Sequence, residues 1–183
     1  DNRRQRQMCI RDRLTGSGYH DHNWGNTPLQ YLFDNWVWFR GEIEDKTIVA
    51  AVLYMTDKRG GYDVPILYIA DSLKVHVNKF GEDGLYTRKS TRITDLYNKH
   101  NEPLFKELDM ITEDGFRVNI IGNSVIDNSN LFKRGRMPYP IRLAMGAAKI
   151  DPFYTRFDSE MSLSIDGKAP KTGFGVFEIM DLK

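Results

Sequence analysis

The chain has 183 residues, with 26 Lys and Arg against 25 Asp and Glu, four His and one Cys. This nearly neutral balance excludes a strongly basic nucleic-acid-binding protein, and the single cysteine excludes a disulfide framework. No apolar run reaches the length of about 18 residues that a membrane-spanning helix requires.

The first 13 residues differ in character from the rest of the chain. Residues 3–13 read Arg-Arg-Gln-Arg-Gln-Met-Cys-Ile-Arg-Asp-Arg, which matches an in-frame translation of a transposase-type sequencing adapter. A basic N-terminal arm for nucleic acid is the alternative interpretation. We expect residues 1–13 to be non-native, residues 14–183 to form one domain, and an unknown length of chain to be missing upstream. Without residues 1–13 the balance becomes 21 Lys and Arg against 23 Asp and Glu, and no cysteine remains.

The segment 18–25 is the first candidate site. It reads Gly-Tyr-His-Asp-His-Asn-Trp-Gly and places two imidazoles, a carboxylate, an amide and an indole between two glycines. Such a set is costly to bury and is not expected on an ordinary surface. If the segment is extended, its side chains alternate between two faces. One face then carries His20, His22 and Trp24, and the other carries Asp21 and Asn23.

The chain beyond this segment is typical of short strands. Apolar, β-branched and aromatic residues form runs that end at Gly or Asp turns every ten residues or so. This spacing predicts an all-β fold, either a barrel or a sandwich. The expected strands are 36–43, 47–56, 64–70, 74–77, 116–121, 161–165 and 174–180; a turn or two of helix is expected at 94–99 and at 104–108, and a strand break at 138–140.

Two tryptophans in the first of these strands are candidate ligand contacts. Trp36 and Trp38 share one face of the strand, while Val37 and Phe39 share the other. Core packing is one explanation for the tryptophan face, and the lining of a ligand cavity is the other. We therefore include Trp36 and Trp38 among the candidate substrate-binding residues, with His20, Asp21 and Asn23.

The sequence resembles the hydroxyneurosporene synthase (carotenoid 1,2-hydratase) family. The resemblance rests mainly on the His-Asp-His-Asn-Trp signature of segment 18–25. It extends to Asn26-Thr27-Pro28-Leu29, Trp36-Val37-Trp38, 152–157 and 173–180. The resemblance implies two lipocalin-like antiparallel β-barrels, of which residues 14–183 would be the second. It also implies addition of water to an isoprenoid C=C bond of a lipophilic substrate, without a cofactor.

This chemistry can be compared with the residues present. Hydration of a trisubstituted alkene requires an acid that stays protonated, a π-face for the carbocation, and a base for the attacking water. By resemblance, His22 activates or orients the water and Trp24 stabilises the cation. The family also uses a tyrosine and an aspartate separated by one residue, for which Tyr54 and Asp57 are the nearest match. Here two residues separate them, so they would face opposite sides of an ideal strand unless a bulge intervenes; Asp71 after Tyr68 shares this difficulty.

Three other interpretations remain open. The first is a non-catalytic lipocalin-type carrier of an apolar ligand, in which the histidine cluster only forms hydrogen bonds across the barrel mouth. The second is a metal site on His20 and His22, for which His76 or His100 would have to supply a third imidazole. The third is a structural junction between two barrels. Our main hypothesis includes no metal.

The expected partners follow from the hydratase hypothesis. They are a hydrophobic small molecule, the missing N-terminal barrel of the same chain, and a membrane surface at which a lipophilic substrate would be found. We expect no nucleic-acid partner. The sequence does not indicate the cellular compartment or the oligomeric state.

Overall fold

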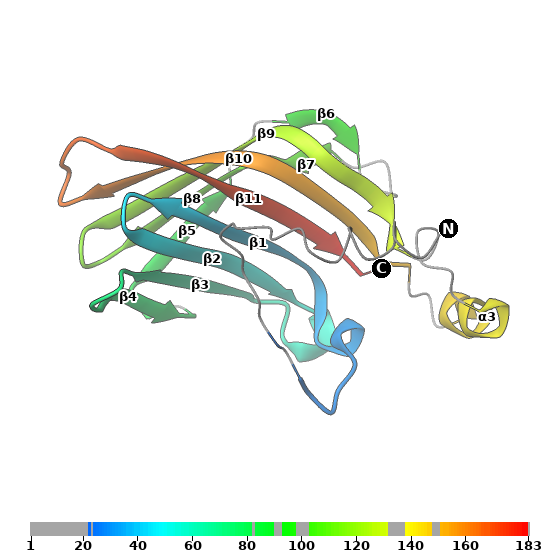
Figure 1. Ribbon diagram of the computed structural model, residues 1–183. Coiled ribbons are helices and arrows are strands. Elements are labelled where there is room, and N and C mark those ends of the chain that lie inside the picture. Colours follow the sequence, from blue (N-terminus) through cyan, green and yellow to red (C-terminus); the bar gives the residue numbers. More distant parts are fainter. Residues whose placement is uncertain are drawn as a thin grey trace, which may run out of the picture.

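The computed structural model describes residues 22, 24–81, 83–89, 93–97, 103–131, 138–147 and 151–182. Nine strands form one antiparallel sheet in the order β4-β3-β2-β1-β11-β10-β9-β8-β5, which curls into a nearly closed barrel (Figure 1). The strands are β1 (Phe33–Ile43), β2 (Lys46–Met55), β3 (Asp63–Ala70), β4 (Val75–Phe80), β5 (Leu85–Lys89), β6 (Ile93–Tyr97), β7 (Pro103–Phe105), β8 (Glu107–Thr112), β9 (Phe116–Asn130), β10 (Phe153–Ile165) and β11 (Lys171–Asp181). The helices are the 3-10 turns η1 (Leu29–Tyr31) and η2 (Asp57–Arg59) and the α-helix α3 (Tyr139–Ala147).

One strand pairing and one contact between strands bring the sheet round on itself. β1 pairs with β11 from Asn35↔Asp181 to Glu42↔Phe174, which joins the first and last strands of the domain. The sheet edges β4 and β5 are consecutive along the chain, and β3 contacts β5 across the gap. β6 and β7 form a separate two-stranded sheet. The all-β barrel predicted from the turn spacing is therefore confirmed.

A glycine pair allows β1 and β11 to approach closely. Gly41 and Gly175 are direct cross-strand partners. A Cβ atom at Gly175 would lie 2.3 Å from the carbonyl oxygen of Arg40, and one at Gly41 would lie 2.6 Å from the ring of Phe39. Phe39 therefore occupies the space that two side chains would otherwise fill, which explains why glycine is needed at both positions.

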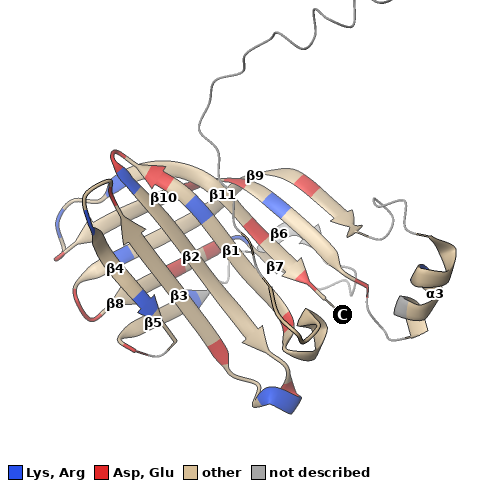
Figure 2. Ribbon diagram, turned by 60° about the horizontal axis from the view of Figure 1, so that its bottom comes forward, with Lys and Arg blue, Asp and Glu red and all other residues tan. Residues whose placement is uncertain are grey.

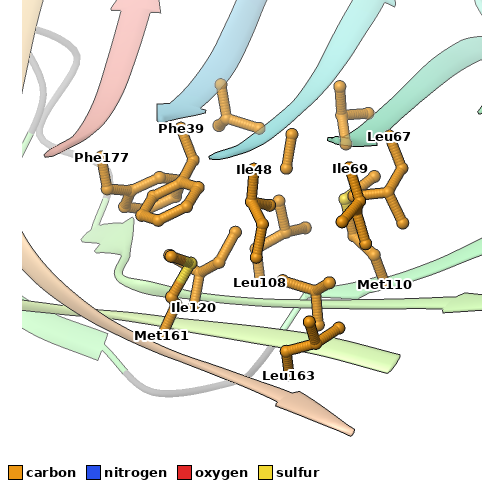
Figure 3. Packing of buried hydrophobic residues seen from close by; sticks show 14 of the residues in the cluster. Phe39, Ile48, Leu67, Ile69, Leu108, Met110, Ile120, Met161, Leu163 and Phe177 are labelled. Carbon is orange, nitrogen blue, oxygen red and sulfur yellow. The ribbon is translucent and has the colours of Figure 1, made fainter. Parts of the chain in front are cut away.

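Large apolar side chains from both walls fill the barrel interior (Figure 3). Phe177 packs against Phe157 with ring centroids 6.1 Å apart, and against Phe105 of β7 at 6.3 Å. The other large side chains that are less than 2% exposed are Val37, Phe39, Ile43, Ile48, Leu67, Ile69, Leu108, Met110, Ile120 and Met161. The alternation of buried and exposed residues along each strand therefore places one apolar face of the whole sheet inside the barrel.

Three local predictions are wrong. The segment expected to form a helical turn at 94–99 is a strand over its described residues, where β6 pairs with β7. The segment expected to form helical turns at 104–108 belongs to β7 and β8, because Leu108 pairs with Ile120 across β9 and both are fully buried. The segment around Pro140, expected to break a strand, instead begins α3, where proline is tolerated in the first turn. No helix in the described part of the chain is long and apolar enough to cross a membrane.

Candidate functional site

Of the His-Asp-His-Asn-Trp signature, the structure describes His22 and Trp24, and both are exposed. The imidazole of His22 and the indole of Trp24 lie edge to face, with ring centroids 5.8 Å apart, and Trp24 is 87% exposed. Trp24 precedes η1 by five residues, so its Cα lies within about 18 Å of the Cα of Leu29. His20, Asp21 and Asn23 lie outside the described residues, as do residues 1–13.

Tyr54 and Asp57 are not brought together. Tyr54 is 8% exposed and belongs to the core cluster, whereas Asp57 follows the end of β2 and is exposed on η2. The residue directly opposite Tyr54 is Asp63, at the start of β3. Burial, followed by the charge of Asp63, raises the pKa of the Tyr54 phenol, so this phenol stays protonated at neutral pH. The tyrosine therefore has an aspartate neighbour, but it is Asp63 and not Asp57.

An apolar groove of about 560 Å³ ends at the same aspartate. Its lining residues are Phe33, Leu53, Met55, Tyr62, Asp63, Val64, Phe80 and Gly81. Leu53 and Val64 are cross-strand partners, and they alternate with core residues, so the groove lies on the outer face of the barrel. In Figure 2, β2 and β3 carry almost no charged residue along their length. Asp63 is the charged residue of this lining. As the cross-strand partner of the inward-facing Tyr54 it has the inward register, but it is exposed at the first position of β3 and therefore lies at the rim, where the inner and outer faces meet.

Trp36 and Trp38 lie on this outer face. Both are half-buried, while Val37 and Phe39 between and beside them are fully buried in the core. Trp36 is the cross-strand partner of Leu53, a groove residue, and its ring lies 6.5 Å from that of Phe33 in an edge-to-face arrangement. The two tryptophans therefore neither fill the core nor line an interior cavity, and Trp36 adjoins the groove.

Asp71, the other candidate acid, has a different environment from the groove. Oδ2 of Asp71 lies 2.5 Å from Nε2 of His76, and Oδ1 accepts hydrogen bonds from the backbone amides of Leu73 and Lys74. The hydrogen bond from His76 and those two amides hold the pKa of Asp71 well below its usual range. A carboxylate stabilised in this way remains ionised and is unsuited to protonating an alkene.

His76 is therefore engaged by Asp71. In the described part of the chain, no group of three or more His, Cys, Asp or Glu side chains could hold a metal ion. His20 and His100, the other members of the metal hypothesis, lie outside the described residues.

A second polar cluster on the outer face was not anticipated from the sequence. Arg156 of β10 forms an ion pair with Glu178 of β11 at 2.7 Å, and its guanidinium lies 5.3 Å from the ring centre of Tyr154. Burial and a hydrogen bond with Glu178 raise the pKa of Tyr154. Glu178 is also the cross-strand partner of Trp38. The outer face of β1 thus has apolar neighbours on one side and a cation, an acid and a phenol on the other.

Comparisons with known proteins identify related folds but no family. No protein-family model matches the chain, and no curated protein matches it. Among solved structures, kievitone hydratase from Nectria haematococca is similar, with a TM-score of 0.55 and 12% identity over 86% of this chain and 42% of that chain. CghA, solved alone and with Sch210972, is similar with a TM-score of 0.56 and 10% identity over 84% of this chain and 42% of that chain.

These similarities concern the fold. The chain has a lipocalin-like antiparallel barrel that also occurs in these neighbours, one of which is a hydratase. It spans less than half of the length of each of these neighbours. At 10–12% identity the likeness does not transfer an activity or a site residue.

Proposed function

We propose that this chain is part of a hydratase-like protein that adds water to a C=C bond of a lipophilic, isoprenoid-type substrate. The observation that carries the proposal is the position of Asp63 at the barrel rim, where it is the charged residue in the lining of an apolar groove and the cross-strand partner of the buried Tyr54. An acid beside an apolar wall is what protonation of an isolated alkene requires. The hydratase among the structural neighbours is consistent with this reaction class.

The proposed reaction has three steps. Asp63, in its protonated form, transfers a proton to one carbon of the double bond, and the π electrons form the new C–H bond. The indole of Trp24 stabilises the resulting tertiary carbocation through its π-face. Water then attacks the cation while His22 accepts the released proton, which returns to Asp63 to complete the cycle.

The remaining residues have supporting roles in this proposal. Tyr54, whose raised pKa keeps it neutral, acts as a hydrogen-bond donor near Asp63. Trp36 extends the groove wall beside Leu53. From the sequence, His20, Asp21, Asn23 and Trp38 remain candidate substrate contacts.

The open groove and the exposed rings of His22 and Trp24 favour a site that is completed by another part of the intact protein. Trp24 is 87% exposed, and an indole that is open to solvent cannot exclude water from a carbocation. We propose that the intact protein supplies a second barrel that covers the groove and the His22–Trp24 pair. The length of the structural neighbours is compatible with this arrangement.

The main test is a pair of charge-removing substitutions, D63N and D57N. Both remove one exposed carboxylate from the same hairpin, but only Asp63 lines the groove. The substrate would be an isoprenoid alcohol with a terminal trisubstituted double bond, supplied in ¹⁸O-labelled water, and mass spectrometry would detect labelled tertiary alcohol. The assay would use this chain, and also this chain extended by the sequence encoded upstream.

We expect D63N to lower the hydration rate by about a hundredfold or more, and D57N to leave it near the original rate. Equal rates for D63N and the unmodified protein would show that Asp63 is not the acid. Absence of labelled product from both proteins would contradict the reaction class. Tight binding of the alkene without product would instead indicate a carrier, whose ligand we would place in the groove rather than among the packed side chains of the core cluster.

A further inference from the structure

Polar residues form one row across four neighbouring strands at the end of the barrel where β1 begins and β11 ends (Figure 1). We call this row the rim row. Each of its residues is the cross-strand partner of the next, and they are Asp63 of β3, Tyr54 of β2, Asn35 of β1 and Asp181 of β11. Tyr54 is buried, whereas Asn35 and Asp181 are half-buried and Asp63 is exposed. The rim row is therefore partly open to a ligand.

The inward-facing residues of these strands change from polar to apolar directly behind the rim row. The next inward residues on β1 and β11 are Val37 and Ile179, and both belong to the core cluster. Towards the opposite end of the barrel the inner faces carry Ile43, Ile48 and Leu163, which are at most 4% exposed. The barrel therefore has one polar and one apolar end, and a polar group of a ligand is favoured only at the first.

The rim row is continuous with the groove, because Asp63 belongs to both. Neighbouring strands lie about 4.8 Å apart, so Asn35 and Asp181 lie about 10 Å and about 14 Å from Asp63 along the sheet. A ligand whose branched alkene end occupies the groove, and whose chain follows the rim, then places its other end beside Asn35 and Asp181.

The chemistry of these two side chains favours a hydroxyl group at that end of the ligand. A carboxylate such as that of Asp181 only accepts hydrogen bonds, whereas the amide of Asn35 both donates and accepts. A hydroxyl group can donate to the first and accept from the second. A ligand that ends in a carboxylate would instead meet the like charge of Asp181.

We propose that Asn35 and Asp181 are specificity-determining residues that bind the hydroxyl end of a lipophilic alcohol and disfavour the corresponding carboxylic acid. This inference names the substrate class of the proposed function and rests on that function for the position of the double bond at Asp63. A separation of about 10–14 Å between the double bond and the hydroxyl group suits farnesol. Geraniol is one isoprene unit shorter and would not reach from Asp63 to Asp181.

The test measures equilibrium binding of farnesol, geraniol and farnesoic acid to the full 183-residue chain, through the fluorescence of its tryptophans. D181N removes the charge and keeps the shape of the side chain, and N35L removes the amide. The control is D45N, which removes an exposed carboxylate from the turn between β1 and β2, at the opposite end of β1. Circular dichroism checks that each variant keeps its β-sheet spectrum.

We expect the unmodified chain and D45N to bind farnesol about tenfold more tightly than farnesoic acid. In D181N this ratio should fall to about twofold, through tighter binding of the acid, because the repulsion between like charges is lost. N35L should weaken farnesol binding by roughly fivefold, because one hydrogen-bond partner is lost. Geraniol should bind more weakly than farnesol.

Three results would overturn the inference: no binding of farnesol, equal affinity for farnesol and farnesoic acid, or the same ratio in D181N as in D45N. The ¹⁸O assay separates these results from failure of the proposed function. Selective binding of farnesol without labelled product would contradict hydration and retain the specificity assignment for a carrier. Labelled product from farnesol without selective binding would contradict this inference alone.

Discussion

The packed interior predicts a large cost for truncating Phe177. Its side chain is fully buried, it stacks on Phe157 at 6.1 Å and it contacts Phe105 at 6.3 Å. Phenylalanine-to-alanine substitutions in filled cores cost about 3–5 kcal/mol, part of which is loss of contacts between rings. For a domain of this size the expected drop in melting temperature is about 8–15 °C. A barrel with a ligand-sized interior cavity would lose much less, because the ring would already lie beside empty space.

The assay is urea unfolding of F177A, with F174A as the matched control. Phe174 lies on the same strand, faces the opposite side and is 72% exposed. We expect F174A to change the free energy of unfolding by about 1 kcal/mol or less. If F177A and F174A cost the same, the interior is not packed as described, and a carrier with its ligand inside the barrel becomes the better interpretation.

Two further predictions concern stability. G175A should prevent folding or destabilise the barrel severely, because its Cβ atom would lie 2.3 Å from the carbonyl oxygen of Arg40. G146A is the control and should be tolerated, because nothing lies within 4 Å of a Cβ atom at that position. Soluble expression and thermal unfolding of the two variants would check this prediction. The lowered pKa of Asp71 contributes stability that is present above its ordinary value of 3.8 and is lost as the pH falls below it. D71N should therefore be less stable than the unmodified chain at neutral pH, and the difference should shrink on acidification; a difference that stays constant down to acid pH would refute the role of the Asp71–His76 pair.

Strand positions could be predicted from the sequence because they depend on local alternation. Val37 and Phe39 alternate with Trp36 and Trp38, and the structure separates these pairs onto opposite faces. What alternation could not decide was which face becomes the interior. Both faces of β1 are apolar, and the choice depends on the partners that β11 and β2 contribute, such as Phe177 opposite Phe39.

Element type was wrong where tertiary pairing outweighs local preference. Residues 104–108 contain leucines spaced four apart, which suits a helix, but Leu108 is held in a strand by its pairing with Ile120. α3 was missed for the opposite reason. Its prolines suggested a break in a strand. Its apolar residues also form no stripe along one face of the helix, which is the pattern by which a helix packed on a protein is recognised in a sequence.

The acid at the candidate site was missed because its neighbour lies on another strand. Asp57 is close to Tyr54 in the sequence, but η2 carries it out of the sheet. Asp63 is nine residues away along the chain and directly opposite in the sheet, because the β2–β3 pairing is centred between Lys58 and Arg59. A hairpin centred between Lys58 and Arg59 pairs Tyr54 with Asp63. A hairpin centred on Gly60 and Gly61 would shift the pairing register and give Tyr54 a different partner.

The filled interior and the outer groove have a common origin in this sequence. Among the described residues, three phenylalanines and several large aliphatic side chains point inward and pack into one core cluster that stabilises the barrel. The groove lies on the outer face, where Trp36, Leu53 and Val64 form one cross-strand row over β1, β2 and β3. Asp63 stands at the rim of that face, exposed to solvent and lining the groove. Our proposal that Asp63 is the acid rests on this position, and the D63N and D57N pair tests it, because both residues are exposed in the same hairpin and only Asp63 lines the groove.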